Sequence, residues 1–131
     1  MNEAQIDSSH FQWLSHLLGL DLTSNAFTII RNISFIGLRL LDELSLSNNL
    51  VARIDNLSFT GMSQLNKLDL NFNKLKFIKR GMFSGLKNLE NLTLASNELE
   101  DFDTVFDDIP NIVVFELDDN TNSFSFRIQV C

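Results

Sequence analysis

The sequence predicts one α/β domain built as a solenoid, with short parallel strands on a concave face and loops or short helical turns on the convex face. Two observations predict this fold. The pattern LxxLxLxxN recurs along the chain at a spacing of 24 residues, and the segments between its copies repeat at the same spacing. Self-similarity at a fixed period of this length is typical of stacked repeats, which bury a continuous core only when neighbours pack together.

The pattern is present in five copies. They are Leu17-Leu20-Leu22-Asn25, Leu41-Leu44-Leu46-Asn49, Leu65-Leu68-Leu70-Asn73, Leu89-Leu92-Leu94-Asn97 and, displaced by 23 residues, Ile112-Phe115-Leu117-Asn120. We expect the second and third apolar positions of each copy to form a short strand with these side chains directed inward. Neighbouring strands then pair in parallel.

The segments between the copies carry the motif F-x-G-L/M, as Phe35-Ile36-Gly37-Leu38, Phe59-Thr60-Gly61-Met62 and Phe83-Ser84-Gly85-Leu86. Together with LxxLxLxxN, this motif resembles the leucine-rich repeat family in its 24-residue, extracellular-type form, over roughly residues 6–124. The resemblance implies a horseshoe segment from the ectodomain of a receptor or adhesion protein, of the Toll-like or a related kind.

The repeat register divides residues 1–131 of a single domain into successive turns. They are a partial repeat at 1–16, repeats at 17–40, 41–64, 65–88 and 89–111, and a last repeat with a C-terminal cover at 112–131. Met1 to Leu14, with Trp13, are expected to act as a lid over the first repeat. Alternation of Phe124, Phe126, Ile128 and Val130 with polar residues predicts a covering strand at the other end.

The cysteine-bearing caps of extracellular family members are absent, because the one cysteine is Cys131. This absence favours a fragment of a longer solenoid. A fragment is expected to expose a strand edge at Leu17 to Leu22 and to self-associate through its open ends.

Two columns of equivalent residues are expected to hold the turns together. The phenylalanines at 11, 35, 59, 83 and 106 should form a spine beneath the outer face. The asparagines Asn25, Asn49, Asn73, Asn97 and Asn120 should form a buried polar column, because an amide can donate and accept between adjacent backbone loops. We assign them a structural role.

The positions beside the inward leucines point out from the concave sheet and are candidates for partner binding. Their central column reads Asp21, Ser45, Asp69, Thr93 and Glu116. Eight acids on this face, which are Asp21, Asp42, Glu43, Asp69, Glu90, Glu116, Asp118 and Asp119, accompany one lysine, Lys67. A basic protein or peptide could bind there, with the large apolar Phe72 as an anchor. The alternatives are an ordinary solvated acidic face and a Phe72 side chain folded over the sheet edge.

The overall charge of the chain also favours a basic partner. The chain has 17 acidic and 10 basic residues and a net charge of −7, which argues against nucleic acid as a partner. No apolar stretch is long enough to insert into a membrane. Three N-glycosylation sequons begin at Asn32, Asn56 and Asn91, the first two on the outer return and the third on the concave sheet.

No catalytic or metal-binding pattern is found, and no cofactor is expected. His10 and His16 lack a paired nucleophile, and the aspartates between 101 and 119 lack the spacing of a calcium loop. The sequence therefore predicts a protein-binding module rather than an enzyme, located outside the cell or at its surface. The alternative is a complete small intracellular (cytoplasmic) scaffold or adaptor. A regulatory subunit of an enzyme is disfavoured, because such repeats run near 22 residues.

Overall fold

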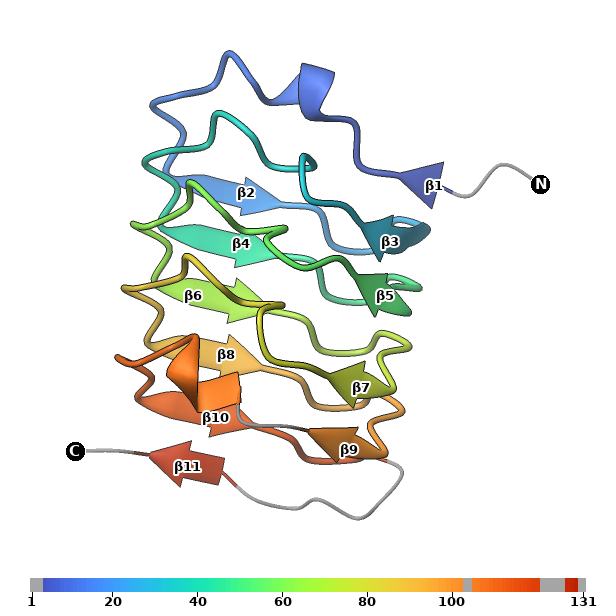
Figure 1. The fold of residues 1–131 in the computed structure, drawn as a ribbon. Coiled ribbons are helices and arrows are strands. Elements are labelled where there is room, and N and C mark those ends of the chain that lie inside the picture. The colour runs from blue at the N-terminus through green and yellow to red at the C-terminus, as the bar shows by residue number, and fades with distance from the viewer. Residues whose placement is uncertain (1–3, 103–104, 121–126, 130–131) are drawn as a thin grey trace.

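A computed structural model describes residues 4–102, 105–120 and 127–129 of the chain. The chain winds into stacked turns, each of which adds a short strand to a six-stranded sheet (Figure 1). The strands of this sheet are β2 (Gly19–Asp21), β4 (Glu43–Ser45), β6 (Lys67–Asp69), β8 (Asn91–Thr93), β10 (Val114–Glu116) and β11 (Arg127–Gln129). We call the outward side of this sheet, expected to be concave, the sheet face.

The register of the sheet follows the sequence repeat. Strands β2, β4, β6, β8 and β10 pair in parallel, in that order. The middle residue of each strand pairs with its equivalent in the next turn. These middle residues are Leu20, Leu44, Leu68, Leu92 and Phe115. Since side chains alternate along a strand, this register directs every middle residue into the core and the residues on either side of it outward. The predicted solenoid with parallel strands is confirmed.

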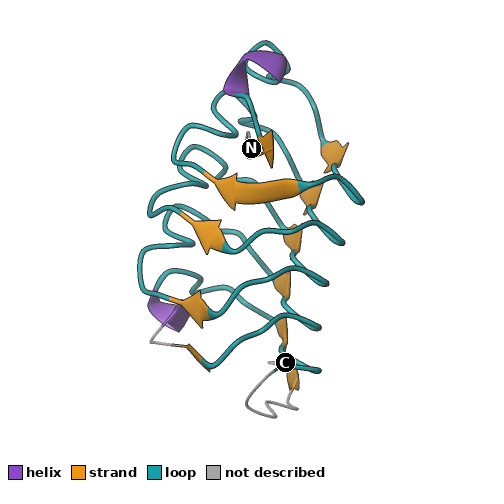
Figure 2. Ribbon diagram, turned by 90° about the vertical axis from the view of Figure 1, so that its right-hand side faces the viewer, coloured by secondary structure: helices purple, strands orange, loops and turns teal. Residues whose placement is uncertain are grey.

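The returns carry strands that the sequence did not predict. Strands β1 (Ala4–Gln5), β3 (Phe27–Ile30) and β5 (Arg53–Ile54) form one small sheet, and β7 (Phe77–Ile78) and β9 (Asp101–Phe102) form another. Figure 2 shows these strands on the side of the stack away from the sheet face. The expected short helical turns are the 3-10 helices η1 (Ser8–His10) and η2 (Val105–Asp107).

The core contains a stack of phenylalanine rings, one for each turn. The ring centroids of Phe11 and Phe35 lie 6.5 Å apart, those of Phe35 and Phe59 5.9 Å, and those of Phe59 and Phe83 5.8 Å, all in stacked orientation. In the shorter last turn, Phe106 instead meets Phe115 edge to face, with centroids 5.0 Å apart.

The asparagines link each turn to the one before it. The Asn73 side-chain amide donates to the carbonyl of Leu46 in the preceding turn (3.0 Å) and to that of Leu70 in its own turn (3.1 Å), while its oxygen accepts the Val51 amide (3.0 Å). Asn49, Asn97 and Asn120 make the same set of bonds.

The prediction that all five asparagines are buried is wrong for Asn25. Its side chain is exposed and donates only to carbonyls of its own loop, those of Leu22 and Thr23, because no earlier copy of the loop lies against it. Asn120, in the last copy, is half-buried.

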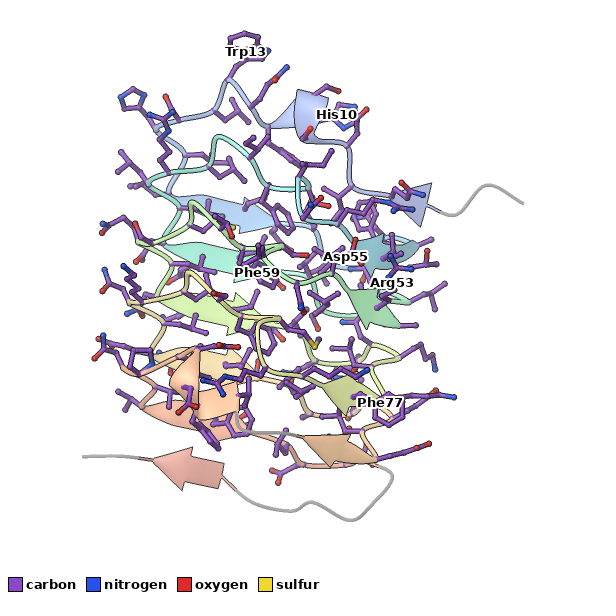
Figure 3. All side chains as sticks on the ribbon, viewed as in Figure 1. His10, Trp13, Arg53, Asp55, Phe59 and Phe77 are labelled. Atoms are coloured by element: carbon purple, nitrogen blue, oxygen red, sulfur yellow. The ribbon has the colours of Figure 1, made fainter. Side chains whose placement is uncertain are left out.

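The described part of the N-terminal segment covers the first return, as expected, but Trp13 does not take part. Strand β1 pairs with β3, and Ile6 is buried in the core. Phe11 contributes its ring to the stack, but Trp13 is 82% exposed and points away from the body of the molecule (Figure 3). Strand β2 is the first of the six strands in the order of this sheet, beside β4. At the other end, β11 pairs antiparallel with β10. Phe124, Phe126 and Val130 of the expected covering strand lie outside the described residues.

Candidate binding face

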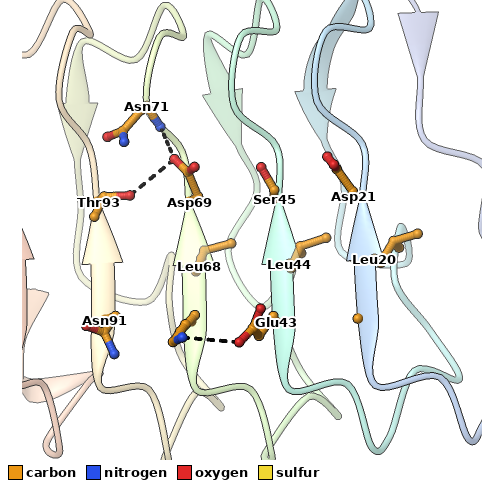
Figure 4. Close-up of a pocket in the computed structure, with 12 residues that line it drawn as sticks. Leu20, Asp21, Glu43, Leu44, Ser45, Leu68, Asp69, Asn71, Asn91 and Thr93 are labelled. Atoms are coloured by element: carbon orange, nitrogen blue, oxygen red, sulfur yellow. Dashed lines mark hydrogen bonds and ion pairs between the residues drawn. The ribbon is translucent and has the colours of Figure 1, made fainter.

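A shallow groove of about 640 Å³ crosses the sheet face over β2, β4, β6 and β8 (Figure 4). Two rows of outward side chains line it, because the residues before and after each inward leucine project from the same side of a strand. The first row is Gly19, Glu43, Lys67 and Asn91, and the second is Asp21, Ser45, Asp69 and Thr93. The structure thus brings four of the five central-column residues into one surface.

Hydrogen bonds along the second row hold its side chains in place. Asp69 Oδ1 accepts hydrogen bonds from the backbone amide of Asn71 (2.9 Å) and from the Thr93 hydroxyl (3.1 Å). The other carboxylate oxygen of Asp69 is left for a partner. The hydroxyls of Thr23 and Ser45 bond to each other at 2.9 Å. A hydrogen bond from the Thr23 side chain, joined by one from its backbone amide at 2.9 Å, keeps the pKa of Asp21 below its usual value. Asp21 is therefore ionised at neutral pH.

The lysine of the sheet face is already paired. Lys67 Nζ lies 3.2 Å from Glu43 Oε1, and both side chains are well exposed. An exposed pair of this kind contributes little stability, but it neutralises the positive charge in the first row. Asp21 and Asp69 then dominate the charge of the groove.

Glu116, the last residue of the central column, differs from the other four. It lies on β10 outside the groove lining, and the antiparallel register sets it opposite Arg127 of β11. The alternation around Ile128 predicted a strand at this end, but not its register against β10.

Phe72 is exposed at the end of the third copy of the repeat. Its side chain is 59% exposed, and its backbone is left-handed, with φ of 55°. The equivalent residues Ser24, Asn48, Ser96 and Asp119 share this conformation. Short polar residues tolerate it better than an aromatic one. The equivalents of Phe72 in the neighbouring turns are polar and hydrogen-bonded in pairs. The Asn48 side chain donates to the Ser24 hydroxyl (2.9 Å), and the Ser96 hydroxyl donates to Asp119 (2.8 Å).

A second hollow of about 500 Å³ lies where the chain enters the strands of the sheet. Its lining combines amides with the carboxylates of two predicted acids and consists of Asp42, Gln64, Asn66, Asn88, Glu90, Asn111 and Val113. It extends the polar, acidic surface beyond the groove.

The three sequons occupy two kinds of site. Asn32 and Asn56 are exposed on the returns, whereas Asn91 is half-buried and lines the groove. Ser34 and Ser58, the hydroxyl residues of the first two sequons, are buried, and the Ser58 hydroxyl donates to the carbonyls of Asp55 and Ile30.

Within the described part of the chain, no three His, Cys, Asp or Glu side chains come together as a metal site would require. His10 and His16 lie on the exposed N-terminal segment. None of the described helices has the length and apolar character needed to cross a bilayer.

Comparison with known proteins gives a family and a fold. The family model described as leucine rich repeat matches residues 4–51, 41–99 and 63–121. Among solved structures, the chain is similar to TLR13 in a TLR13–ssRNA13 complex, with a TM-score of 0.74 and 29% identity. That match covers 77% of this chain but only 14% of the TLR13 chain. Comparison with curated protein sequences gave no match.

Proposed function

Because the chain belongs to the leucine-rich repeat family, we propose that it is a protein-binding recognition module that takes a basic protein or peptide on its sheet face. The observation that carries this proposal is the groove over β2 to β8. Two acids, Asp21 and Asp69, line it, and its lysine is already paired with Glu43. Acidic surfaces steer basic partners toward them and disfavour acidic ones.

Phe72 supplies the apolar contact in this proposal. Hot spots of protein interfaces are rich in aromatic residues that lose their water on binding. Phe72 exposes a large ring between two polar pairs and holds an unfavourable backbone angle. Residues held in such conformations cluster at binding and active sites, and its place beside Asn71 of the groove lining fits an anchor.

The test compares two double variants that change the net charge equally. Asp21→Asn with Asp69→Asn alters the groove while an amide oxygen still accepts the bonds from Thr23 and Asn71. Asp55→Asn with Asp107→Asn alters the returns. Binding to an array of short basic, neutral and acidic peptides is measured at low and physiological ionic strength. We expect the first variant to bind basic peptides about 3- to 10-fold more weakly, since each exposed ion pair contributes up to about 1 kcal/mol.

The salt dependence of binding should flatten in the first variant only. Equal losses in the two variants would show that overall charge, and not the groove, attracts the peptides. An unchanged affinity for basic peptides in the first variant would contradict the proposal. Both variants should keep the same melting temperature as the original chain, which a thermal scan by circular dichroism checks.

Nucleic acid is the competing partner, because the similar TLR13 structure is a complex with ssRNA13. We propose that the sheet face of this chain does not bind RNA, since its carboxylates would repel the phosphate backbone. Fluorescence anisotropy with a labelled short single-stranded RNA tests this. Binding that survives physiological salt and weakens when Asp21 or Asp69 is changed would overturn it.

We further propose that the chain acts outside the cell or at its surface, as part of a receptor-like ectodomain without catalytic activity. In this proposal Asn32 and Asn56 carry glycans. Its likeness to a segment of TLR13 and the exposure of both asparagines support this. The native protein, immunoblotted with and without removal of N-glycans, should lose mass on treatment. An unshifted band would favour the intracellular adaptor.

A further inference from the structure

The two acids of the groove lie a fixed distance apart along it. Asp21, Ser45 and Asp69 occupy the same position on β2, β4 and β6, and the three strands pair in register. Since neighbouring strands lie about 4.8 Å apart, the two strand spacings between Asp21 and Asp69 amount to about 9.6 Å. The groove crosses the strands, so a peptide that fills it meets the two carboxylates one after the other (Figure 4).

Each of the two carboxylates has one oxygen that the protein already uses. Asp69 Oδ1 accepts two hydrogen bonds, one from the backbone amide of Asn71 (2.9 Å) and one from the Thr93 hydroxyl (3.1 Å). Asp21 Oδ1 accepts the backbone amide of Thr23 (2.9 Å). Within the part of the chain that the structure describes, no residue donates to the second oxygen of either acid. A ligand therefore finds one free oxygen on each carboxylate.

A single free oxygen suits lysine better than arginine. Arginine binds carboxylates strongly through two parallel N–H···O bonds, which require both oxygens of the acid. At Asp69 the two lone-pair sites of Oδ1 are filled by Asn71 and Thr93, so a guanidinium can form only one of these bonds. The ammonium group of lysine is a compact charge that can bind one oxygen without this loss.

The distance between the acids also selects a backbone conformation for the ligand. In the polyproline II conformation, residues three apart share a face and lie about 9.3 Å apart. An extended strand returns to the same face after two residues, or about 6.7 Å. An α-helix returns to it after seven residues, or about 10.5 Å. Polyproline II therefore comes closest to the spacing of the acids, and its backbone groups, free of internal hydrogen bonds, can bond to the polar lining.

We propose that the groove binds a polyproline II segment with two lysines three residues apart, one placed on Asp21 and the other on Asp69. The inference rests on the proposed function and names the class of basic peptide that the groove takes. Ser45, between the two acids, has a small side chain and leaves room for the peptide backbone between the lysines.

A set of peptides with equal charge tests the proposal. Three carry two lysines in a proline-rich host, separated by two, three or four residues. A fourth replaces the lysines that are three apart by arginines, and a fifth is a helical peptide with lysines seven apart. Fluorescence anisotropy at low ionic strength measures their affinities. We expect the peptide with lysines three apart to bind about 2- to 5-fold more tightly than the other lysine peptides, because a second exposed ion pair adds that much.

Two variants and their controls connect this preference to the groove. Asp69→Asn leaves one charged acid and should abolish the preference for a separation of three, whereas Asp55→Asn, on a return, should keep it. Thr93→Val frees one site on Asp69 Oδ1 and should improve the binding of the arginine peptide relative to the lysine peptide by about 2-fold. Thr60→Val, at an exposed residue of a return, should leave this ratio unchanged.

The inference and the proposed function fail in different ways. Absence of binding by every basic peptide would contradict both. Binding of equal strength at every lysine separation, or binding of the helical peptide as tight as that of the best proline-rich one, would overturn this inference alone. Tighter binding of the arginine peptide by the original chain, or a Thr93→Val variant with an unchanged ratio, would overturn the preference for lysine.

Discussion

The column of asparagines gives the sharpest test of how the turns hold together, because two of its members differ only in their neighbours. Changing Asn73 to Ala removes the acceptor of the buried Val51 amide and the donor to the Leu46 carbonyl of the preceding turn. Leaving a buried polar group without its hydrogen bond costs about 1–3 kcal/mol. Two such groups give an expected loss of about 2–6 kcal/mol in the free energy of unfolding.

The matched control is Asn25→Ala. Asn25 is exposed and bonds only within its own loop, so water can replace the lost bonds. Its loss should stay below about 1 kcal/mol. Urea denaturation followed by far-ultraviolet circular dichroism measures both values. A second variant, Asn73→Asp, keeps an acceptor for Val51 but turns an oxygen toward the carbonyls of Leu46 and Leu70, so it should destabilise the fold at least as much as Asn73→Ala.

The reasoning would be refuted if Asn73→Ala cost no more than Asn25→Ala. In that case the bonds between turns would contribute little beyond what water offers. An Asn73→Asp variant as stable as the original chain would show that the donated bonds do not matter.

Two other predictions concern single phenylalanines. Phe59→Ala opens a cavity in the ring stack and should lower the free energy of unfolding by about 3–5 kcal/mol. Phe77→Ala, at a ring that is 48% exposed, should lower it far less. Equal losses of the two variants in urea denaturation would contradict the stacking argument. Phe72→Asn should raise stability by roughly 1 kcal/mol, because asparagine tolerates the left-handed backbone, and should weaken the binding of basic peptides. A variant that gains stability and keeps its affinity would leave Phe72 without a role in binding.

Much of the fold could be predicted because it follows directly from periodicity. A 24-residue spacing places Leu44 beside Leu20 and Leu68, and only the stacked parallel sheet satisfies that register at every turn. The return strands could not be predicted in the same way. Pairs such as Arg53-Ile54 and Phe77-Ile78 are too short for an alternating pattern to stand out.

The ends were less predictable for a different reason. A repeat pattern predicts the same burial for residues at the same position of every turn. The actual burial also depends on whether a neighbouring turn packs against that residue. Asn25 and Leu20 match the pattern as well as Asn49 and Leu44 do, yet they are more exposed because no turn of the same kind lies beside them. Trp13 stands at the position that Gly37, Gly61 and Gly85 occupy in later turns, so the repeat pattern did not predict where its side chain lies.

In the candidate site, the sequence predicted which side chains face outward but not what each one contacts. The bonds of Asp69 to Asn71 and Thr93 depend on the distance between neighbouring strands. Whether this face is the functional one stays a prediction, which the paired aspartate variants test.

The asparagine link also bears on how such a chain can change its length in evolution. Each link joins a turn only to the turn before it, with the same donors and acceptors at Asn49, Asn73 and Asn97. Duplicating one 24-residue unit in the gene would therefore create a new junction equivalent to the existing ones and leave the others intact. Selection can then lengthen or shorten the sheet face in whole units, while point substitutions at the outward positions alter its chemistry.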